Sequence, residues 1–227
     1  MARAGIASRR KSEEFIERGV VQVNGKVVCE MGVKIDPEVD KVVIDGKKLK
    51  IEKQGYVYYA LNKPRGYVSA AIKNSAVKSE KIITELVPKN PRVFPVGRLD
   101  KDSDGLIILT NDGQLTFKLT HPSQEHEKEY LVTVKQVLQE GALNKLRAGM
   151  NILGQKTKPA VVTKITQNKF KIVLQEGKNR QIRRMCRKVG WEVLRLTRIR
   201  IGQFFLKNIK LGEYRQLAEK ELFLLKS

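Results

Sequence analysis

The amino-acid sequence predicts an α+β protein, with a mixed, mainly antiparallel central sheet and flanking helices, preceded by a small N-terminal α+β module. Apolar runs typical of strands are separated irregularly by helical segments, which argues against a doubly wound parallel sheet. Within the first 50 residues, two short runs each turn on an Asn-Gly or Asp-Gly pair, a strong hairpin signal. A length of 227 residues with 41% hydrophobic residues suffices for one to two domains with buried cores.

The N-terminal module is expected to begin with a helix over residues 9–18. Ser8 is a suitable cap because its hydroxyl can accept a hydrogen bond from the first turn, and Gly19 is typical of a helix end. Two hairpins are expected to follow, over residues 20–28 and 41–49, with turns at Asn24-Gly25 and Asp45-Gly46.

We expect the module to occupy residues 1–50, a polar linker residues 51–55, and a larger domain residues 56–227. Apolar runs in this domain predict strands at 56–62, 92–96, 106–110, 128–135, 160–165, 169–175 and 193–201. Amphipathic spacing and cap residues predict helices at 80–87, 113–120, 139–148, 179–189 and 219–225.

The composition favours a polyanionic partner and excludes several other classes of protein. The chain has 45 Lys and Arg against 24 Asp and Glu, a net charge of +21, and nucleic acid is the first expectation. Two cysteines and two histidines exclude a disulfide scaffold and a standard zinc site, so no metal is expected. The longest apolar runs, such as 106–109, are far shorter than the ~20 residues of a membrane span. The N-terminus lacks the apolar stretch of a signal peptide, and we expect a cytoplasmic protein.

The positive charge is concentrated in the second half of the chain. Residues 121–227 hold 23 basic and 9 acidic residues, a net +14, and residues 178–200 hold nine basic residues and one acid. If residues 179–189 form a helix, an apolar stripe faces the core, and four arginines share the opposite side: Arg180, Arg183, Arg184 and Arg187. We expect this arginine stripe to bind phosphate, with Arg198 and Arg200 extending it. The alternatives are a solvated face and packing of these arginines against a neighbouring acid.

One acidic cluster, Asp100, Asp102 and Asp104 before Gly105, allows three interpretations. It imitates the start of a calcium loop, but position 12 is Asn111 where a bidentate Glu is needed. It is also compatible with an ordinary Asx turn. The functional interpretation is a carboxylate held ionised beside Arg98, which serves as a nucleophile or base.

Two parts of the sequence resemble known families. Residues 4–10 (AGIASRR), 16–19 (IERG) and 23–26 (VNGK) resemble the S-four RNA-binding domain, named after a small-subunit ribosomal protein, in which the Ser-Arg-Arg helix forms part of the RNA-facing surface. The family's first helix normally begins several residues earlier, so the module is expected to be a shortened form.

The segment 97–106 (GRLDKDSDGL) resembles the signature of the pseudouridine synthases that modify ribosomal RNA and carry an S-four domain. Four further motifs agree in order: 62–66 (NKPRG), 127–132 (EKEYLV), 177–185 (GKNRQIRRM) and 196–200 (LTRIR). Within this branch, the motifs are most similar to those of the F-type synthases of large-subunit (23S) ribosomal RNA.

The resemblance implies a role for individual residues. Asp100 corresponds to the catalytic aspartate, Tyr130 to the active-site tyrosine, and Arg183 to the arginine that pairs with the aspartate. Arg98 corresponds to a residue that fills or braces the space left by the flipped base. Lys63 corresponds to the motif lysine near the tyrosine, expected to support the site and not to take part in the chemistry. With the arginine stripe and the first helix, the residues expected to bind RNA are Arg98, Lys63, Arg180, Arg184, Arg187, Arg9 and Arg10.

The implied function is isomerisation of a specific uridine to pseudouridine in ribosomal RNA, with 23S RNA as the expected substrate and no cofactor. The expected partner is a ribosomal RNA stem-loop, with transfer RNA left open as a second substrate, and a monomer is expected. The alternative is a non-catalytic RNA-binding or ribosome-assembly factor on the same fold. Asp100 distinguishes the two, because a protein that only binds RNA has no need of an anion among its cations.

Overall fold

The computed structural model describes the chain except for Arg3, Gly5, Pro37, residues 50–54, 74–77 and 122–125, and Ser227. The chain divides into two compact units, Met1–Gly55 and Tyr56–Ser227. Residues 51–54 of the predicted linker lie outside the described residues. Among the described helices, none combines the length and apolar character needed to cross a membrane.

The N-terminal unit contains one helix and a small antiparallel sheet. Helix α1 (Arg9–Glu17) is capped as predicted, because the Ser8 hydroxyl accepts a hydrogen bond from the Lys11 amide at 3.2 Å. Both predicted hairpins are confirmed. Their strands lie in the order β2-β1-β3-β4, with bounds Lys26–Val27 (β2), Val21–Val23 (β1), Val42–Ile44 (β3) and Lys47–Lys48 (β4).

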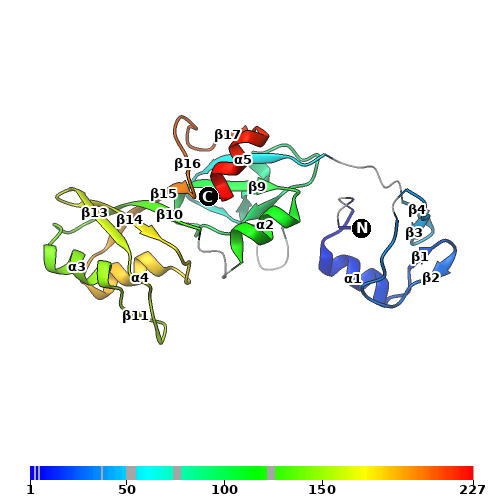
Figure 1. The fold of residues 1–227 in the computed structure, drawn as a ribbon, viewed down its shortest axis with the longest axis horizontal. Coiled ribbons are helices and arrows are strands. Elements are labelled where there is room, and N and C mark those ends of the chain that lie inside the picture. The colour runs from blue at the N-terminus through cyan, green and yellow to red at the C-terminus, as the bar shows by residue number, and fades with distance from the viewer. Residues whose placement is uncertain are drawn as a thin grey trace. The chain divides into compact units, whose positions relative to one another are not determined.

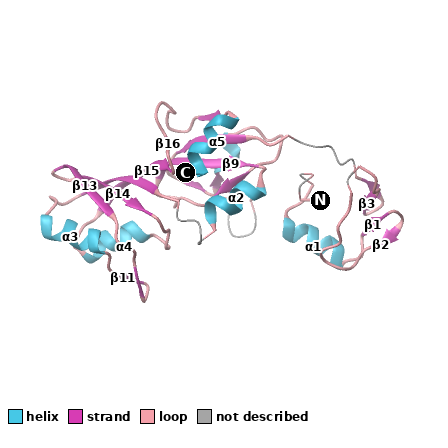
Figure 2. Cartoon of the chain, in the orientation of Figure 1, coloured by secondary structure: helices cyan, strands magenta, loops and turns pink. Residues whose placement is uncertain are grey.

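The second unit is built on one large sheet, which has nine strands among the described residues (Figures 1 and 2). Its main path follows the order β13-β14-β10-β15-β9-β5-β17, and β16 and β8 pair with β15 and β9. The bounds are Tyr58–Lys63 (β5), Phe94–Val96 (β8), Asp104–Thr110 (β9), Lys128–Val134 (β10), Val161–Thr166 (β13), Lys169–Leu174 (β14), Val193–Ile201 (β15), Phe204–Phe205 (β16) and Tyr214–Gln216 (β17). Its pairs are antiparallel except β9 with β15, which confirms the mixed, mainly antiparallel sheet.

Two pairs of helices cover different parts of this sheet (Figure 1). Helices α3 (Glu140–Ala148) and α4 (Gln181–Lys188) bury Leu143, Leu146 and Met185 against β10 and β14. The other two, α2 (Gly113–Thr120) and α5 (Glu219–Lys226), pack against β5, β9 and β16. Each helix therefore buries the apolar side that its sequence spacing predicted.

The prediction fails in three places. The helix expected over 80–87 is a short strand, β7 (Lys81–Ile82), followed by a single 3-10 turn, η2 (Ile83–Leu86). The helix expected over 179–189 is shorter, because Arg180 adopts a left-handed conformation (φ 51°) and α4 begins only at Gln181. Several two- and three-residue strands lack a periodic sequence signal: β6 (Tyr67–Val68), β11 (Asn151–Ile152), β12 (Gln155–Lys156), β16 and β17.

The parallel contact between β9 and β15 positions the acidic cluster. At this contact Gly105 lies directly beside Arg198, and a Cβ at Gly105 would lie 2.3 Å from the Arg198 carbonyl oxygen. Only glycine permits this approach, and its φ of +108° is also one that other residues rarely adopt. The chain thus enters β9 at the centre of the sheet, and the preceding segment, residues 97–103, lies where strands from both halves of the sheet meet.

Candidate active site

Residues 98–103, which we call the aspartate loop, are held through their backbone. Each of the six carbonyl oxygens of this loop accepts a hydrogen bond. Because these bonds fix every residue of the loop, the side chain of Asp100 leaves the backbone from a defined position. In order along the loop, the donors are the Arg198 guanidinium, the Ser69 hydroxyl, the Lys63 ammonium, the Gly66 amide, the Arg65 guanidinium and again the Lys63 ammonium.

Lys63 is the central support of the loop. Its side chain is fully buried, and its Nζ donates to the carbonyl oxygens of Asp100 (3.0 Å), Ser103 (2.7 Å) and Pro64 (3.1 Å). Burial lowers the pKa of Lys63 to about 8, although the nearby aspartates raise it in part, so the ammonium is protonated at neutral pH. The expected RNA contact of Lys63 is therefore wrong, since a buried ammonium with three carbonyl acceptors cannot reach a phosphate.

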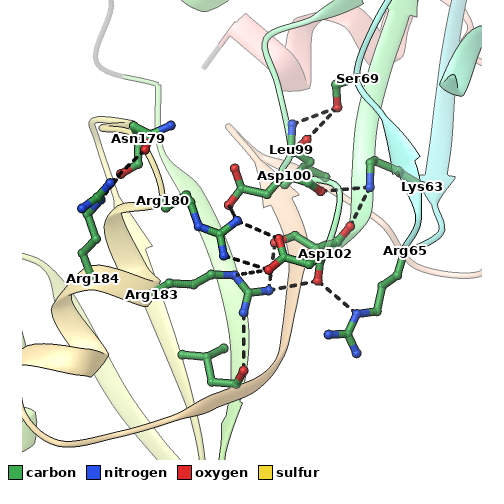
Figure 3. A network of polar contacts seen from close by, with 12 residues as sticks. Lys63, Arg65, Ser69, Leu99, Asp100, Asp102, Asn179, Arg180, Arg183 and Arg184 are labelled. Carbon is green, nitrogen blue, oxygen red and sulfur yellow. Dashed lines mark hydrogen bonds and ion pairs between the residues drawn. The ribbon is translucent and has the colours of Figure 1, made fainter. Parts of the chain in front are cut away.

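Arg180 lies between two carboxylates of the loop (Figure 3). Its guanidinium donates to both oxygens of Asp102, at 3.0 and 2.8 Å, and its Nη1 lies 3.7 Å from Oδ2 of Asp100. The hydrogen bond from Arg180 lowers the pKa of Asp102, although burial opposes the shift. The left-handed backbone turns Arg180 toward the loop, so it leaves the predicted stripe and its primary contact is with carboxylates.

Arg183 also contacts Asp102, and this corrects a second expectation. Its Nε lies 3.3 Å from Asp102 Oδ2, and its Nη2 donates to the Asp102 carbonyl at 2.9 Å and to the Ser103 hydroxyl at 3.3 Å. Burial lowers the pKa of Arg183, although Asp102 raises it in part. The predicted ion pair of Arg183 with Asp100 is therefore replaced by one with Asp102, because Arg183 sits one turn farther along α4.

The third aspartate of the cluster, Asp104, is buried in the sheet. Its carboxylate accepts from the Arg195 guanidinium at 2.6 and 3.0 Å and from the Thr197 hydroxyl at 2.8 Å. It therefore ties β9 to β15. Asp102 and Asp104 are both paired with arginines, whereas Asp100 has the loosest cation contact of the three acids.

A cleft of about 300 Å³ lies beside Asp100. Arg98 and Tyr130 also line it, together with the apolar side chains of Ile182 and Leu196; Tyr130 is half-buried and lies on the same side of β10 as the buried Val132. The Asp100 side chain is about one-third exposed (31%), so a molecule in the cleft can reach its carboxylate. The cleft combines the loosely paired carboxylate of Asp100, one aromatic ring, and both apolar and polar walls, the latter including Glu176, which is paired with Lys178. Its volume is at the small end of the range of ligand sites.

A second cavity, of about 460 Å³, adjoins the first and is lined by Arg180, Arg183, Arg184 and Arg187. Arg184 donates from its Nε to the Asn179 carbonyl at 3.0 Å, whereas Arg187 is exposed and its guanidinium makes no hydrogen bond or ion pair with the described residues. The four predicted arginines therefore do converge, but Arg180 and Arg183 face the loop and Arg187 faces outward.

The remaining predicted basic residues differ in their surroundings. Arg9 and Arg10 are exposed on α1. Arg98 is exposed at the cleft. The expected extension of the basic surface by β15 is wrong, because Arg198 is buried with its Nε on the Leu106 carbonyl, and Arg200 is paired with Glu127 and Glu129.

Sequence reasoning missed several residues of the site. Asp102 was interpreted only as part of a calcium-like pattern, yet its carboxylate forms ion pairs with Arg180 and Arg183 at the start of α4. Arg65 stands in a recognised motif, whereas Ser69, whose hydroxyl bonds both the amide and the carbonyl of Leu99, follows that motif without any signal of its own.

Comparisons with known proteins identify the family of the chain. Residues 57–188 match the model of the RNA pseudouridylate synthase family, and residues 1–40 match that of the S4 domain. The chain is 41% identical to ribosomal large subunit pseudouridine synthase B of Bacillus subtilis, over 98% of this chain and 91% of the relative. It is 43% identical to the dual-specificity RNA pseudouridine synthase RluF of Escherichia coli K12, over 98% of this chain and 75% of the relative. A crystal structure of a pseudouridylate synthase is similar in fold, with a TM-score of 0.72 and 29% identity, over 99% of this chain and 96% of that one.

Proposed function

The chain belongs to the RNA pseudouridylate synthase family, and we propose that it isomerises a specific uridine of large-subunit (23S) ribosomal RNA with Asp100 as the catalytic carboxylate. It is a pseudouridine synthase with an S4 domain, and its substrate is RNA. In this reaction the bond from ribose to uracil N1 breaks, the base rotates, and a bond forms to carbon 5, which gives up its hydrogen.

The observation that carries the assignment of Asp100 is its position in the cleft. The carboxylate stands on a loop fixed at every carbonyl, about one-third exposed, and its only cation contact among the described side chains is the 3.7 Å approach of Arg180. An anion that is held in position but loosely paired is available to act on the ribose or on the base. Asp102 and Asp104 lack this availability, because arginines bind both.

The cleft also suits a flipped base. A uridine within a stem must leave the stack to reach Asp100, at a cost of a few kcal/mol. The Tyr130 ring and the side chains of Ile182 and Leu196 offer apolar surface for the uracil, which offsets part of that cost. Arg98, at the same opening, is placed to support the RNA at the position that the base leaves.

The exposed arginines are proposed to hold the RNA backbone. The Arg187 guanidinium has no partner among the described residues and lines the second cavity, as Arg184 does. In the N-terminal unit, Arg9 and Arg10 are exposed on the helix of the S4 domain. Phosphate contacts by arginine are bidentate and depend on salt concentration, which makes them measurable one by one.

The finer assignments rest on the relatives. One is named for the large ribosomal subunit, and another is named a dual-specificity RNA pseudouridine synthase. We therefore propose 23S RNA as the first substrate and include transfer RNA as a second one to be tested. A monomer acting in the cytoplasm remains our expectation.

The proposal is tested by release of tritium from RNA labelled at carbon 5 of uridine, because formation of pseudouridine replaces that hydrogen. We expect Asp100→Asn to lower turnover of a large-subunit RNA by about 10³-fold or more while RNA affinity stays within about twofold. Glu219→Gln, an exposed carboxylate on α5, removes the same charge and should leave turnover unchanged. If Asp100→Asn releases tritium at the wild-type rate, Asp100 is not catalytic, and if the wild type releases none, the chain only binds RNA.

A further inference from the structure

Three hairpins in this chain share one turn geometry but differ at one residue. Their two central residues both have positive φ: Asn24 and Gly25 (52° and 81°), Asp45 and Gly46 (49° and 73°), and Leu153 and Gly154 (51° and 74°). Asn and Asp are favoured at the first position, because a short polar side chain tolerates the left-handed conformation. Leucine does not, and it is the one apolar side chain among the described non-glycine residues with positive φ.

The third hairpin presents this unfavourable leucine to solvent. Leu153 is 56% exposed at the turn between β11 and β12, whereas its neighbour Ile152 is buried in the core formed with α3 and α4. At the base of the hairpin, the Met150 amide donates to the Thr157 hydroxyl at 3.0 Å, and the Thr157 amide donates to the Met150 carbonyl at the same distance. The hairpin is thus anchored at its base, and it extends beyond α4 in Figure 1.

The segment of sequence that carries Leu153 is basic. Residues 141–175 contain seven Lys and Arg and no Asp or Glu. The hairpin packs beside α4, the helix that carries the exposed Arg187, and the Lys178 ammonium reaches the Lys156 carbonyl at 3.5 Å. A partner of this surface must offer negative charge to the basic residues and an apolar face to the leucine. A nucleic acid offers both, through its phosphates and its bases.

We propose that Leu153 is an apolar wedge that contacts a base of the RNA substrate, while basic side chains of the same segment hold the phosphates. Proteins that distort nucleic acids insert leucine or similar side chains against base steps, and stacking on bases tolerates many sequences. This inference rests on the proposed function, because the substrate must be an RNA with at least one accessible base. Contact with RNA accounts for a leucine at this left-handed position, where asparagine would suit the turn better.

The decisive variant is Leu153→Asn, because it improves the turn while it removes the wedge. We expect its Tm to equal or exceed that of the wild type, by roughly 2 °C, and its kcat/KM on large-subunit RNA to fall about tenfold. Leu153→Phe keeps an apolar side chain and should retain kcat/KM within about threefold. Val161→Thr removes another exposed apolar side chain, on the edge strand β13, and should leave both quantities unchanged.

Salt dependence separates a wedge from a phosphate contact. Because leucine is uncharged, Leu153→Asn should weaken RNA binding without changing the slope of affinity against salt concentration. Wild-type kcat/KM in Leu153→Asn would overturn the inference while leaving the proposed function intact. A Tm well below that of the wild type would also overturn it, because leucine would then be serving the turn. If the wild type forms no pseudouridine, the proposed function itself fails.

Discussion

The basic residues of the second unit, Tyr56–Ser227, include two groups that differ in burial and in hydrogen bonding. The interior cations, Lys63, Arg183 and Arg198, are largely buried and donate to backbone carbonyls in or beside the aspartate loop. The surface cations, Arg98 and Arg187, are exposed, and their guanidiniums have no partner among the described residues. The net charge of +21 includes the cations of both regions. Only the surface cations are free to bind RNA phosphates and so to release the counterions of the RNA.

The difference teaches that charge has two uses in this protein. Buried carbonyl oxygens need donors, and a lysine or arginine satisfies two or three of them from one side chain. The interior cations therefore organise the loop that carries Asp100, and the surface cations are left to hold RNA. Variants of the two regions should affect different measurements: kcat and stability for the interior, and affinity and salt dependence for the surface.

The largest effect is expected for Lys63→Met. This variant keeps the volume of the side chain but removes the donor from three carbonyl oxygens, two of which belong to the aspartate loop. We expect a loss of about 1–3 kcal/mol in the free energy of unfolding and a fall in kcat of about 10²-fold. Lys220→Met, at an exposed position of α5, is the matched control. Normal kcat in Lys63→Met would remove the distinction between the two regions.

A direct comparison within one helix is given by Arg183→Ala and Arg187→Ala. Arg183→Ala should lower kcat about tenfold or more, because Asp102 and the loop lose a donor, and should leave the salt dependence unchanged. Arg187→Ala should keep kcat within about twofold and flatten the slope of log affinity against log salt concentration by about one unit. Binding and turnover are measured at four salt concentrations. A lower kcat in Arg187→Ala together with a flatter salt dependence in Arg183→Ala would contradict the assignment.

The smallest effect concerns pH. The hydrogen bond from Arg180 lowers the pKa of Asp102, so the ionised carboxylate stabilises the folded state at pH values above its unfolded pKa of about 3.9. That contribution is lost as the pH falls through the lower folded pKa. The difference in Tm between the wild type and Asp102→Asn should therefore be constant from about pH 5 to 8 and shrink below about pH 4. A difference that grows as the pH falls below 4 would have the wrong sign.

Much of the fold could be predicted from sequence, because long elements carry periodic signals. The bounds of α2 and β15 agree with expectation to the residue. The start of α4 was missed, because the left-handed conformation of Arg180 has no signature in residue type. Short strands such as β6 and β17 are defined by their partners in the sheet, which local patterns do not contain.

The sequence predicted which residues belong to the site, but not which of them contact one another. Motifs located Asp100, Tyr130 and Arg183, yet which carboxylate Arg183 meets depends on the position of α4 relative to the loop. Likewise, Lys63 is the last residue of β5, a strand in which every residue is buried. Only the tertiary structure shows that its ammonium donates to the aspartate loop.

The catalytic assignment is tested most directly by mapping pseudouridines in large-subunit ribosomal RNA from cells that lack this chain. Complementation with the wild type is expected to restore at least one pseudouridine that is absent without it, and complementation with Asp100→Asn at the same protein level is expected to restore none. Restoration of the same pseudouridine by Asp100→Asn would contradict the role of the carboxylate. An unchanged map in cells without the chain would contradict large-subunit RNA as the substrate.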